Sequence, residues 1–326
     1  MPSSTFVPER PDLRVYAPSG TLLTFLFHGV FRNKSEIEQH VADPQQKITL
    51  SHISQFVEHM LEAGYQFVSP DDVERGLADD GRYVMATFDD GYANNLLVRP
   101  LLEEYGVPAV FFISTGHVLA GTPFWWDVLY RELWRRGASA KQIAQVGQGL
   151  KELTNIEIES VLTSMFGAKS LVAESDIDRP LSVGELQDFA RCPFVHLGNH
   201  TRDHGVLTNY TSTGIAEQLG AAQDDLERMV GLRPTCVSYP NGNYSAEVLR
   251  TARSLGLTLG ITVERARNLL PLDRADDGWL RLGRFTLWGT RDIGEQCDNV
   301  LADSWWKGVW SKFVGRDTRS WQRRSA

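Results

Sequence analysis

Apolar residues in this chain gather in short unbroken runs that alternate with longer helical patterns. Thr21 to Phe27 is the first run, and it is typical of a strand that is buried on both faces. Ser51 to Ala63 carries apolar residues at helical spacing, which predicts an amphipathic helix that ends at Gly64. Tyr83 to Phe88 and Pro108 to Ser114 are further predicted strands.

The same alternation continues along the chain. Strands are expected near residues 194–197, 236–239 and 258–262, with helices at 213–230 and 245–255 between them. Strands separated by helices of roughly ten or more residues pair in parallel, and about seven such units form a closed or nearly closed barrel. The pattern therefore predicts an α/β barrel, which we take as one domain over residues 1–326.

Two segments depart from this rhythm. Residues 117–191 show helical patterns without strong strands, which we interpret as a helical insertion within the barrel domain. An insertion after the carboxyl end of a strand would lie over the barrel mouth, where catalytic loops gather. Residues 292–326 are expected to form a C-terminal helix and a basic tail. The helix would pack its apolar stripe on the barrel, with a membrane surface as the alternative.

Composition narrows the class of protein. Of the 326 residues, 42% are apolar and 23% are charged, which is typical of a soluble globular protein without a transmembrane segment. Cys192, Cys236 and Cys297 form no C-x-x-C pair, so we expect free thiols. The N-terminus lacks the apolar core of a secretory signal, which favours a cytoplasmic location. A net charge of −8 disfavours nucleic acid as a partner.

Two adjacent carboxylates, Asp89 and Asp90, follow one of the apolar strands. Gly91 permits a turn at this point, so both side chains can reach one cleft. Further along lie His200 and His204, and two imidazoles with one carboxylate are ligands that suit a divalent metal. The second carboxylate would then act as a base. Helix capping, an ion pair with an arginine and hydrogen-bonded core imidazoles are the alternatives.

Three short motifs occur in a fixed order. They are T-F-D-D-G-Y at residues 87–92, H-T-x-x-H at 200–204 and Y-P-N-G at 239–242. In combination they resemble the polysaccharide deacetylase family, carbohydrate esterase family 4 of the NodB-homology type, over residues 22–287 without the insertion. The resemblance implies a distorted (β/α)7-type barrel and a metal-dependent hydrolase that removes N-acyl groups from amino sugars.

The resemblance also assigns roles to residues of these motifs. Asp89 matches the catalytic base, and Asp90, His200 and His204 match the three metal ligands. The backbone N–H of Asn241 matches the donor to the developing oxyanion, a contact that typically contributes roughly 3 kcal/mol to the transition state. Three protein ligands leave positions for water and substrate, so we expect one divalent ion, with zinc favoured over cobalt, nickel or manganese.

The chain departs from the family pattern at two positions. No histidine follows His204, so the family's usual late general acid is missing. His28 ends the first strand, which neighbours the last strand in a closed barrel, and we expect it to be the acid rather than a core imidazole. Ser238 stands where an arginine often orients the base. Arg284 is the candidate replacement, with a surface ion pair as the alternative.

Several residues are candidate substrate contacts. Trp125 and Trp126 begin the insertion, and their rings would stack on a sugar or a nucleotide base, with core packing as the alternative. Tyr92, Pro240 and Arg284 are expected to contact the substrate as well.

These features predict removal of an acetyl or formyl group from an amino sugar in surface polysaccharide or lipopolysaccharide (O-antigen) biosynthesis. A cytoplasmic enzyme would not meet finished cell-wall polymers, so we expect a nucleotide-linked or lipid-linked amino sugar as the partner, and peripheral membrane contact stays open. The alternatives are a non-catalytic sugar-binding protein of the same fold and, less favoured, a non-haem iron oxygenase. The sequence predicts no oligomeric state.

Overall fold

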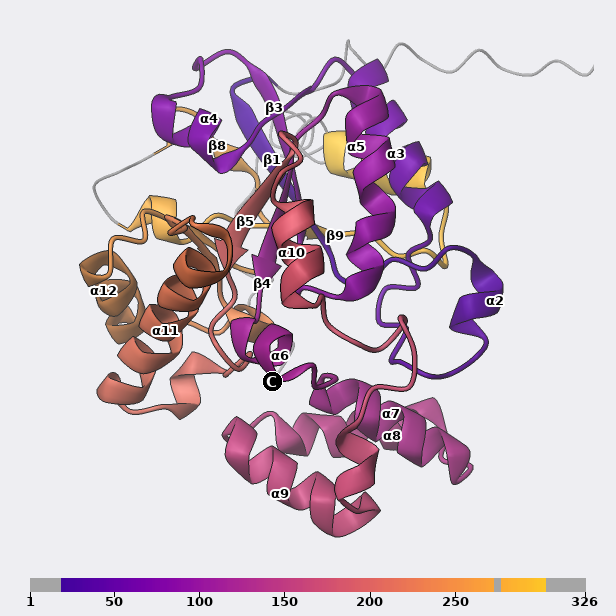
Figure 1. The fold of residues 1–326 in the computed structure, drawn as a ribbon. Helices are drawn as coiled ribbons and strands as arrows, with labels where there is room; N and C mark the ends of the chain where they lie inside the picture. Colours follow the sequence, from indigo (N-terminus) through magenta and orange to yellow (C-terminus); the bar gives the residue numbers. More distant parts are fainter. Residues whose placement is uncertain (1–18, 273–276, 303–326) are drawn as a thin grey trace, which may run out of the picture.

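The computed structural model describes residues 19–272 and 277–302. Its centre is a nine-stranded sheet with the order β7-β6-β5-β4-β3-β1-β8, in which β2 pairs with β3 and β9 pairs with β1 (Figure 1). The strands are β1 (Thr21–Phe27), β2 (Gln66–Phe67), β3 (Arg82–Phe88), β4 (Ala109–Ile113), β5 (Val195–Asn199), β6 (Cys236–Ser238), β7 (Leu259–Ile261), β8 (Asn268–Leu269) and β9 (Phe285–Thr286).

The strands from β1 through β7 pair in parallel and curl into a half-barrel. Residues 282–286 span the remaining gap, because Leu282 bridges to Ile261 in β7 while β9 pairs with β1 in parallel. Every residue of β1 and β4 is buried, as expected for strands that are covered on both faces. The predicted fold class, an α/β fold of the distorted (β/α)7 type, is confirmed.

Helices pack on the sheet through apolar faces. In α3, Ile53, Phe56, Val57 and Met60 are buried in the main core, and a capping box at Thr49 begins the helix. The helices are α2 (Lys34–Ile37), α3 (Leu50–Glu62), α4 (Pro70–Arg75), α5 (Arg99–Tyr105), α6 (Thr115–Ala120), α7 (Trp125–Arg135), α8 (Ala140–Leu150), α9 (Asn155–Phe166), α10 (Val183–Phe189), α11 (Ser212–Val230) and α12 (Ala246–Ser254).

Helices α7, α8 and α9 form a separate lobe next to the barrel (Figure 1). They lie within the predicted insertion 117–191, between β4 and β5, and they bury a cluster of their own that includes Trp125, Leu129 and Leu162. Helix α10 falls in the same range but packs Leu186 and Phe189 into the main core. The lobe is therefore shorter than the helical segment as a whole.

The C-terminal segment is described in part. Residues 293–302 are helical, and Ile293, Cys297 and Val300 pack into the main core. The rest of the predicted helix and the basic tail, residues 303–326, lie outside the described residues. Within the described ranges no helix has the length and apolar character needed to cross a membrane. The three cysteines are free and buried.

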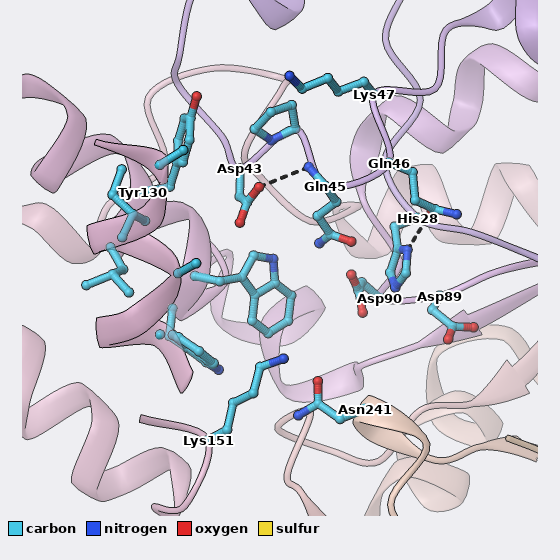
Figure 2. A pocket seen from close by; sticks show the side chains of 18 of the residues that line it. His28, Asp43, Gln45, Gln46, Lys47, Asp89, Asp90, Tyr130, Lys151 and Asn241 are labelled. Atoms are coloured by element: carbon cyan, nitrogen blue, oxygen red, sulfur yellow. Dashed lines mark hydrogen bonds between the residues drawn. The ribbon is translucent and has the colours of Figure 1, made fainter. Parts of the chain in front are cut away.

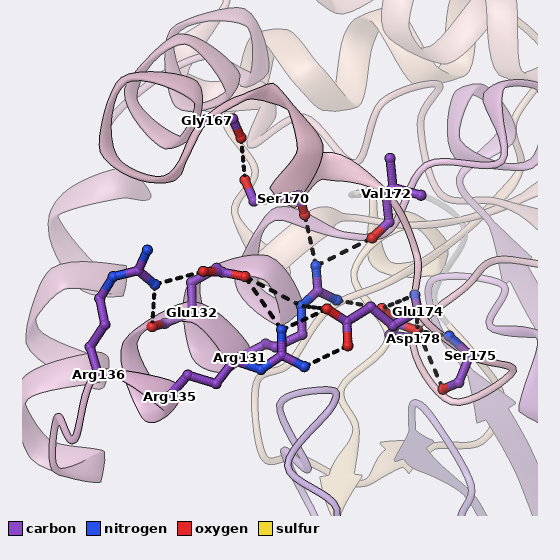
Figure 3. A network of polar contacts seen from close by, with 10 residues as sticks. All are labelled: Arg131, Glu132, Arg135, Arg136, Gly167, Ser170, Val172, Glu174, Ser175 and Asp178. Atoms are coloured by element: carbon purple, nitrogen blue, oxygen red, sulfur yellow. Dashed lines mark hydrogen bonds and ion pairs between the residues drawn. The ribbon is translucent and has the colours of Figure 1, made fainter.

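A buried ion pair connects the lobe to the chain that returns to the barrel (Figure 3). Arg131 of α7 and Asp178 are both fully buried, and Arg131 Nη1 donates to Asp178 Oδ2 at 2.5 Å. Nη2 of the same arginine donates to the Ser170 carbonyl oxygen, while the Asp178 carboxylate accepts from the N–H of Glu174. These contacts pair the two buried charges, and Nε of Arg131 lies 3.2 Å from the Glu174 carboxylate.

We expect Arg131→Met to lower the free energy of unfolding by about 3–5 kcal/mol, because it leaves the Asp178 carboxylate buried without its partner charge. Urea unfolding followed by circular dichroism measures the change. Arg135→Met is the matched control on the same helix, since Arg135 pairs with Glu174 while its side chain is 50% exposed. The control should lose about 1 kcal/mol or less. Equal losses in the two variants would contradict the role given to Arg131.

Candidate metal centre

The candidate site lies at the carboxyl ends of three parallel strands. Asp89 and Asp90 follow β3, His200 follows β5 and Ser238 ends β6. Parallel strands end at the same edge of a sheet, so the fold itself gathers these side chains. The candidate ligand atoms of Asp90, His200 and His204 lie within 4.8 Å of one another, and all three residues are buried. The structure thus brings the predicted triad together.

The backbone of the site adopts left-handed conformations at residues that carry a Cβ. The φ angle is 80° at Asp90, 53° at His204 and 56° at Asn241. Such conformations cost of order 1–3 kcal/mol each and persist where the surroundings enforce them. At Asp90 the reversal continues through Gly91, which has a φ of 89°. This turn lets two successive carboxylates face the same site, whereas in a regular strand they would face opposite sides.

The Asp90 carboxylate faces both histidines. Its Oδ1 lies 3.3 Å from Nε2 of His200 and 3.3 Å from Nε2 of His204. Both carboxylate oxygens are buried without a hydrogen-bond partner among the described residues. Burial alone would raise the pKa of Asp90, but the two imidazoles hold it well below its ordinary value. An ionised, buried carboxylate with open oxygens beside two imidazole nitrogens fits the ligand set of a divalent cation.

The histidine rings present Nε2 to the site. His200 Nδ1 donates to the Ser238 carbonyl oxygen at 2.8 Å, so Nε2 keeps its lone pair in the neutral ring. Burial lowers the pKa of His204 to about 4, which keeps that ring neutral at pH 7. Burial also works to lower the pKa of His200, but the charges of Asp89 and Asp90 outweigh it and the pKa is raised. Positive charge is therefore favoured at this point of the site.

Asp89 is held by a bidentate ion pair with Arg284. Nη1 donates to Oδ1 and Nη2 donates to Oδ2, both at 2.8 Å, and Arg284 is only 1% exposed. Ser238 Oγ donates to Asp89 Oδ2 at 3.0 Å. Burial alone would raise the pKa of Asp89, but the charge of Arg284 outweighs it and the pKa is lowered. Asp89 is thus ionised at neutral pH, and the alternative of a surface ion pair for Arg284 is wrong.

His28 lies at the end of β1 and lines the same cavity as Asp90 (Figure 2). Its Nδ1 lies 2.8 Å from Oε1 of Gln46. Gln46 Nε2 donates to the carbonyl oxygens of Leu26 and Leu287, at 2.7 and 3.1 Å. Oε1 is therefore the acceptor, so Nδ1 of His28 carries a proton and Nε2 is left for proton transfer. Sequence analysis missed Gln46, because a single loop glutamine carries no pattern that distinguishes it.

A cavity of about 820 Å³ extends from the metal centre to the lobe. Asn241 lines it, and Trp125 and Trp126 line it from α7. Trp125 is also buried in the apolar cluster of the lobe, as the alternative of core packing predicted, and a substrate contact by either ring stays a prediction. The Trp126 ring also packs edge-on against the His204 ring, with 4.5 Å between the ring centres. The start of the insertion is therefore in contact with the metal centre.

Three expected substrate contacts occupy other positions. Tyr92, Pro240 and Arg284 are buried and are not among the described residues that line this cavity. The guanidinium of Arg284 is occupied by Asp89, and Tyr92 OH donates to Asp127 Oδ2 at 2.7 Å. We therefore revise the expectation for Tyr92 and Arg284, whereas the contact of Pro240 stays a prediction.

Tyr92 connects the strand end to the lobe instead. Its hydroxyl accepts from Trp126 Nε1 at 2.7 Å and donates to the buried Asp127. Burial raises the pKa of Asp127 well above its ordinary value. Asp127 Oδ1 also accepts from the N–H of Asp43, in the loop before α3. The network fixes Trp126 beside the triad, and Asp127 and Asp43 were not recognised in the sequence because each lies alone in its local pattern.

Comparison with known proteins places this geometry in a family. The family model described as polysaccharide deacetylase matches residues 77–260. Among curated proteins, the putative polysaccharide deacetylase YxkH of Bacillus subtilis (strain 168) is 25% identical over 209 residues. That alignment covers 62% of this chain and 53% of the relative, so it spans about half of the relative's length.

Solved structures share the fold at low identity. The Streptococcus pyogenes deacetylase PplD in complex with acetate aligns with a TM-score of 0.57 and 17% identity, over 87% of this chain and 99% of that one. IcaB from Ammonifex degensii aligns with a TM-score of 0.57 and 16% identity, over 87% and 98%. The family match covers more than half of the chain. The chain therefore belongs to the polysaccharide deacetylase family, the metal-dependent carbohydrate esterases and amidohydrolases that its motifs resemble.

Proposed function

We propose that this chain hydrolyses the acetyl or formyl amide of an amino sugar that is carried on a nucleotide or a lipid. One observation carries the proposal: the buried cluster of Asp90, His200 and His204 lies beside an ionised carboxylate, Asp89, that is clamped by Arg284. Amide hydrolysis needs an electrophilic centre and a base within reach of the same water, and this arrangement supplies both.

Asp90, His200 and His204 would hold one divalent cation, and we propose zinc because one carboxylate and two imidazoles suit it. When bound, such an ion supplies Lewis acidity that polarises the amide carbonyl and lowers the pKa of a water ligand to about 7. The open oxygens of Asp90 and the fixed tautomer of His200 support this choice.

Asp89 accepts the proton of the attacking water. The bidentate contact with Arg284 keeps this carboxylate ionised and fixes its orientation, as a general base requires. Asn241, in the turn after β6, lines the cavity beside the triad. Its backbone N–H is the proposed donor to the oxyanion, a contact that contributes roughly 3 kcal/mol in comparable sites.

His28 delivers a proton to the leaving amine. Because its Nδ1–H is held by Gln46, the proton that moves is the one on Nε2 of the imidazolium. The amide C–N bond breaks, the amine takes this proton, and the acyl group leaves as a carboxylic acid.

A single sugar unit on a carrier is proposed rather than a long polymer. The cavity is bounded by the lobe and by the loop before α3, and such an enclosure suits a small molecule better than a continuous chain. We propose that the reaction belongs to surface polysaccharide or lipopolysaccharide biosynthesis and takes place in the cytoplasm. The location and the pathway stay predictions from the sequence.

Asp89→Asn should reduce turnover by about 10²- to 10⁴-fold, because an amide cannot accept the proton. The assay follows free amine and acetate or formate together, using N-acyl amino-sugar nucleotides as substrates. Metal content at the wild-type level shows that the variant keeps its fold. Unchanged turnover would exclude this mechanism. Sugar binding without turnover in the wild-type protein would favour the alternative of a non-catalytic sugar-binding protein.

Asp90→Asn, His200→Gln and His204→Gln should each release the bound metal. The loss of affinity should exceed the roughly 10- to 100-fold change that follows removal of an outer-shell partner, because a direct ligand is lost. Elemental analysis by mass spectrometry after gel filtration measures the content. His196→Gln is the control, since His196 lies in β5 but does not line the described cavity. Full metal content in all three variants would refute the site.

His28→Gln should lower kcat by about 10²- to 10⁴-fold while KM stays within a few-fold, because the proton is delivered only as the C–N bond breaks. Gln46→Met should lower kcat to a smaller degree, since His28 keeps its acid but loses its orientation. Steady-state kinetics on the metal-loaded enzyme separates kcat from KM. A variant His28→Gln with full kcat would show that another group is the acid.

A further inference from the structure

The two histidines of the triad are held in different ways. His200 Nδ1 donates to the Ser238 carbonyl oxygen at 2.8 Å, which is the kind of contact that normally sets the ring of a metal-binding histidine. His204 has no such contact, because its Nδ1 is buried without a hydrogen-bond partner among the described residues. The orientation of the His204 ring therefore depends on packing rather than on a hydrogen bond.

The loop that carries His204 fixes its backbone but not its ring. The φ angle of His204 is 53°, and Thr201 Oγ1 accepts from the N–H of the next residue, Gly205, at 3.0 Å. Asn199 Oδ1 accepts from the N–H of Thr201 at 2.8 Å. These bonds place the Cβ atom of His204. The two side-chain torsions of the histidine are left to the groups that surround the imidazole.

Trp126 makes the closest ring contact with His204 from outside the triad, among the described aromatic residues. The ring centres are 4.5 Å apart and the planes meet at 62°, which is the edge-on arrangement that aromatic pairs favour. The ring of Phe124 lies farther away, with 6.3 Å between the centres. On another side, His200 lies at 4.8 Å. Trp126 thus limits the rotation of the ring that presents Nε2 to the site.

The indole of Trp126 is itself fixed by its neighbours. Phe124 is fully buried and stacks on it, with 4.8 Å between the ring centres. The indole Nε1 donates to Tyr92 OH at 2.7 Å. The Tyr92 hydroxyl donates to Asp127 Oδ2 at 2.7 Å, and the other oxygen of Asp127 accepts from the N–H of Asp43 at 2.8 Å. These hydrogen bonds connect the turn after β3, the lobe and the loop before α3.

We propose that Trp126 positions His204 as a metal ligand, and that the Tyr92 hydroxyl holds Trp126 in place for this role. The inference rests on the metal site of the proposed function and adds two positioning residues to it. Neither residue needs to touch the cation or the amide. Because Trp126 comes from α7, the affinity of the barrel for its cation depends on the position of the lobe.

Tyr92→Phe should raise the dissociation constant of zinc from the full chain by about tenfold. This is the low end of the roughly 10- to 100-fold change for an outer-shell partner, because the indole stays but loses its hydrogen bond. The variant keeps the ring that packs on Phe124. Tyr92 is 2% exposed and is not among the described residues that line the cavity, so no substrate contact is removed. Competition with a chromophoric chelator measures the affinity, and the unfolding midpoint checks the fold.

A double-mutant cycle tests whether the hydroxyl acts through the indole. Trp126→Leu alone should weaken zinc binding by about 10- to 100-fold. Adding Tyr92→Phe should cause no further loss, because the group that the hydroxyl holds is already gone. A further loss as large as that of Tyr92→Phe alone would show that Tyr92 acts on the nearby Asp90, and would overturn the proposal. If the leucine variant does not fold, Trp126→Phe, which also lacks the N–H, takes its place.

Tyr130→Phe is the matched control on α7. The Tyr130 hydroxyl lies 2.7 Å from His40 Nδ1, and the residue lines the same cavity. This variant should keep the zinc affinity of the wild-type protein. The visible absorption of the cobalt-loaded protein gives a second measurement, since it reports coordination geometry. It should change in Tyr92→Phe and stay unchanged in Tyr130→Phe. Equal losses of zinc affinity in the two tyrosine variants would contradict the proposal.

The inference and the proposed function fail separately. Zinc binding that is unchanged in Tyr92→Phe and in Trp126→Leu would overturn the inference and leave the triad as the ligand set. Absence of zinc binding in the wild-type protein would refute the metal centre and the inference with it. The predicted losses of affinity without turnover of any N-acyl amino sugar would support the inference and contradict the proposed reaction.

Discussion

The contact between Arg284 and Asp89 determines what the rest of the site can do. Two successive carboxylates are buried at the end of β3, and the desolvation of two like charges in one place is costly. Arg284 neutralises Asp89 through two hydrogen bonds, while Asp90 keeps both oxygens open among the described residues. One carboxylate is thus fixed for the proposed role of base, and the other is left open for the proposed role of metal ligand. Without the arginine, both would compete for the same cation.

This division of roles depends on how the barrel closes. Arg284 belongs to the segment that bridges β7 and β1, so its guanidinium reaches Asp89 only when the strands around the gap are in register. Gln46 depends on the same closure of the barrel. Its amide donates to the carbonyl oxygen of Leu26 at the end of β1 and to that of Leu287 just after β9, while its Oε1 accepts from His28. The proposed base and the proposed acid are therefore both oriented by the closing segment. A distortion there would disturb the two proposed proton transfers together.

The sequence predicted those parts that follow from periodicity or from local motifs. The strands, the barrel class and the cluster of Asp90, His200 and His204 needed only apolar runs and residues placed after strand ends. Arg284 was proposed as the partner of Asp89, but its complete burial, which removes it from the cavity, depends on distant strands. Gln46 and Asp127 could not be found, because each acts through contacts with residues tens of positions away in the chain. Tyr92 was assigned to the substrate because the sequence does not show that Trp126 and Asp127 bind its hydroxyl.

The lobe supplies one wall of the cavity, which the barrel alone lacks. The barrel supplies the triad, Asp89 and His28, whereas α7 and α8 supply the far wall of the cavity. The lobe is held by the buried Arg131–Asp178 pair and touches the triad through Trp126, which packs on His204. Substrate size and the chemistry at the triad are therefore linked through one helix. In such an arrangement, an exchange of lobe residues can change which molecules fit the cavity while the barrel residues around the triad stay the same.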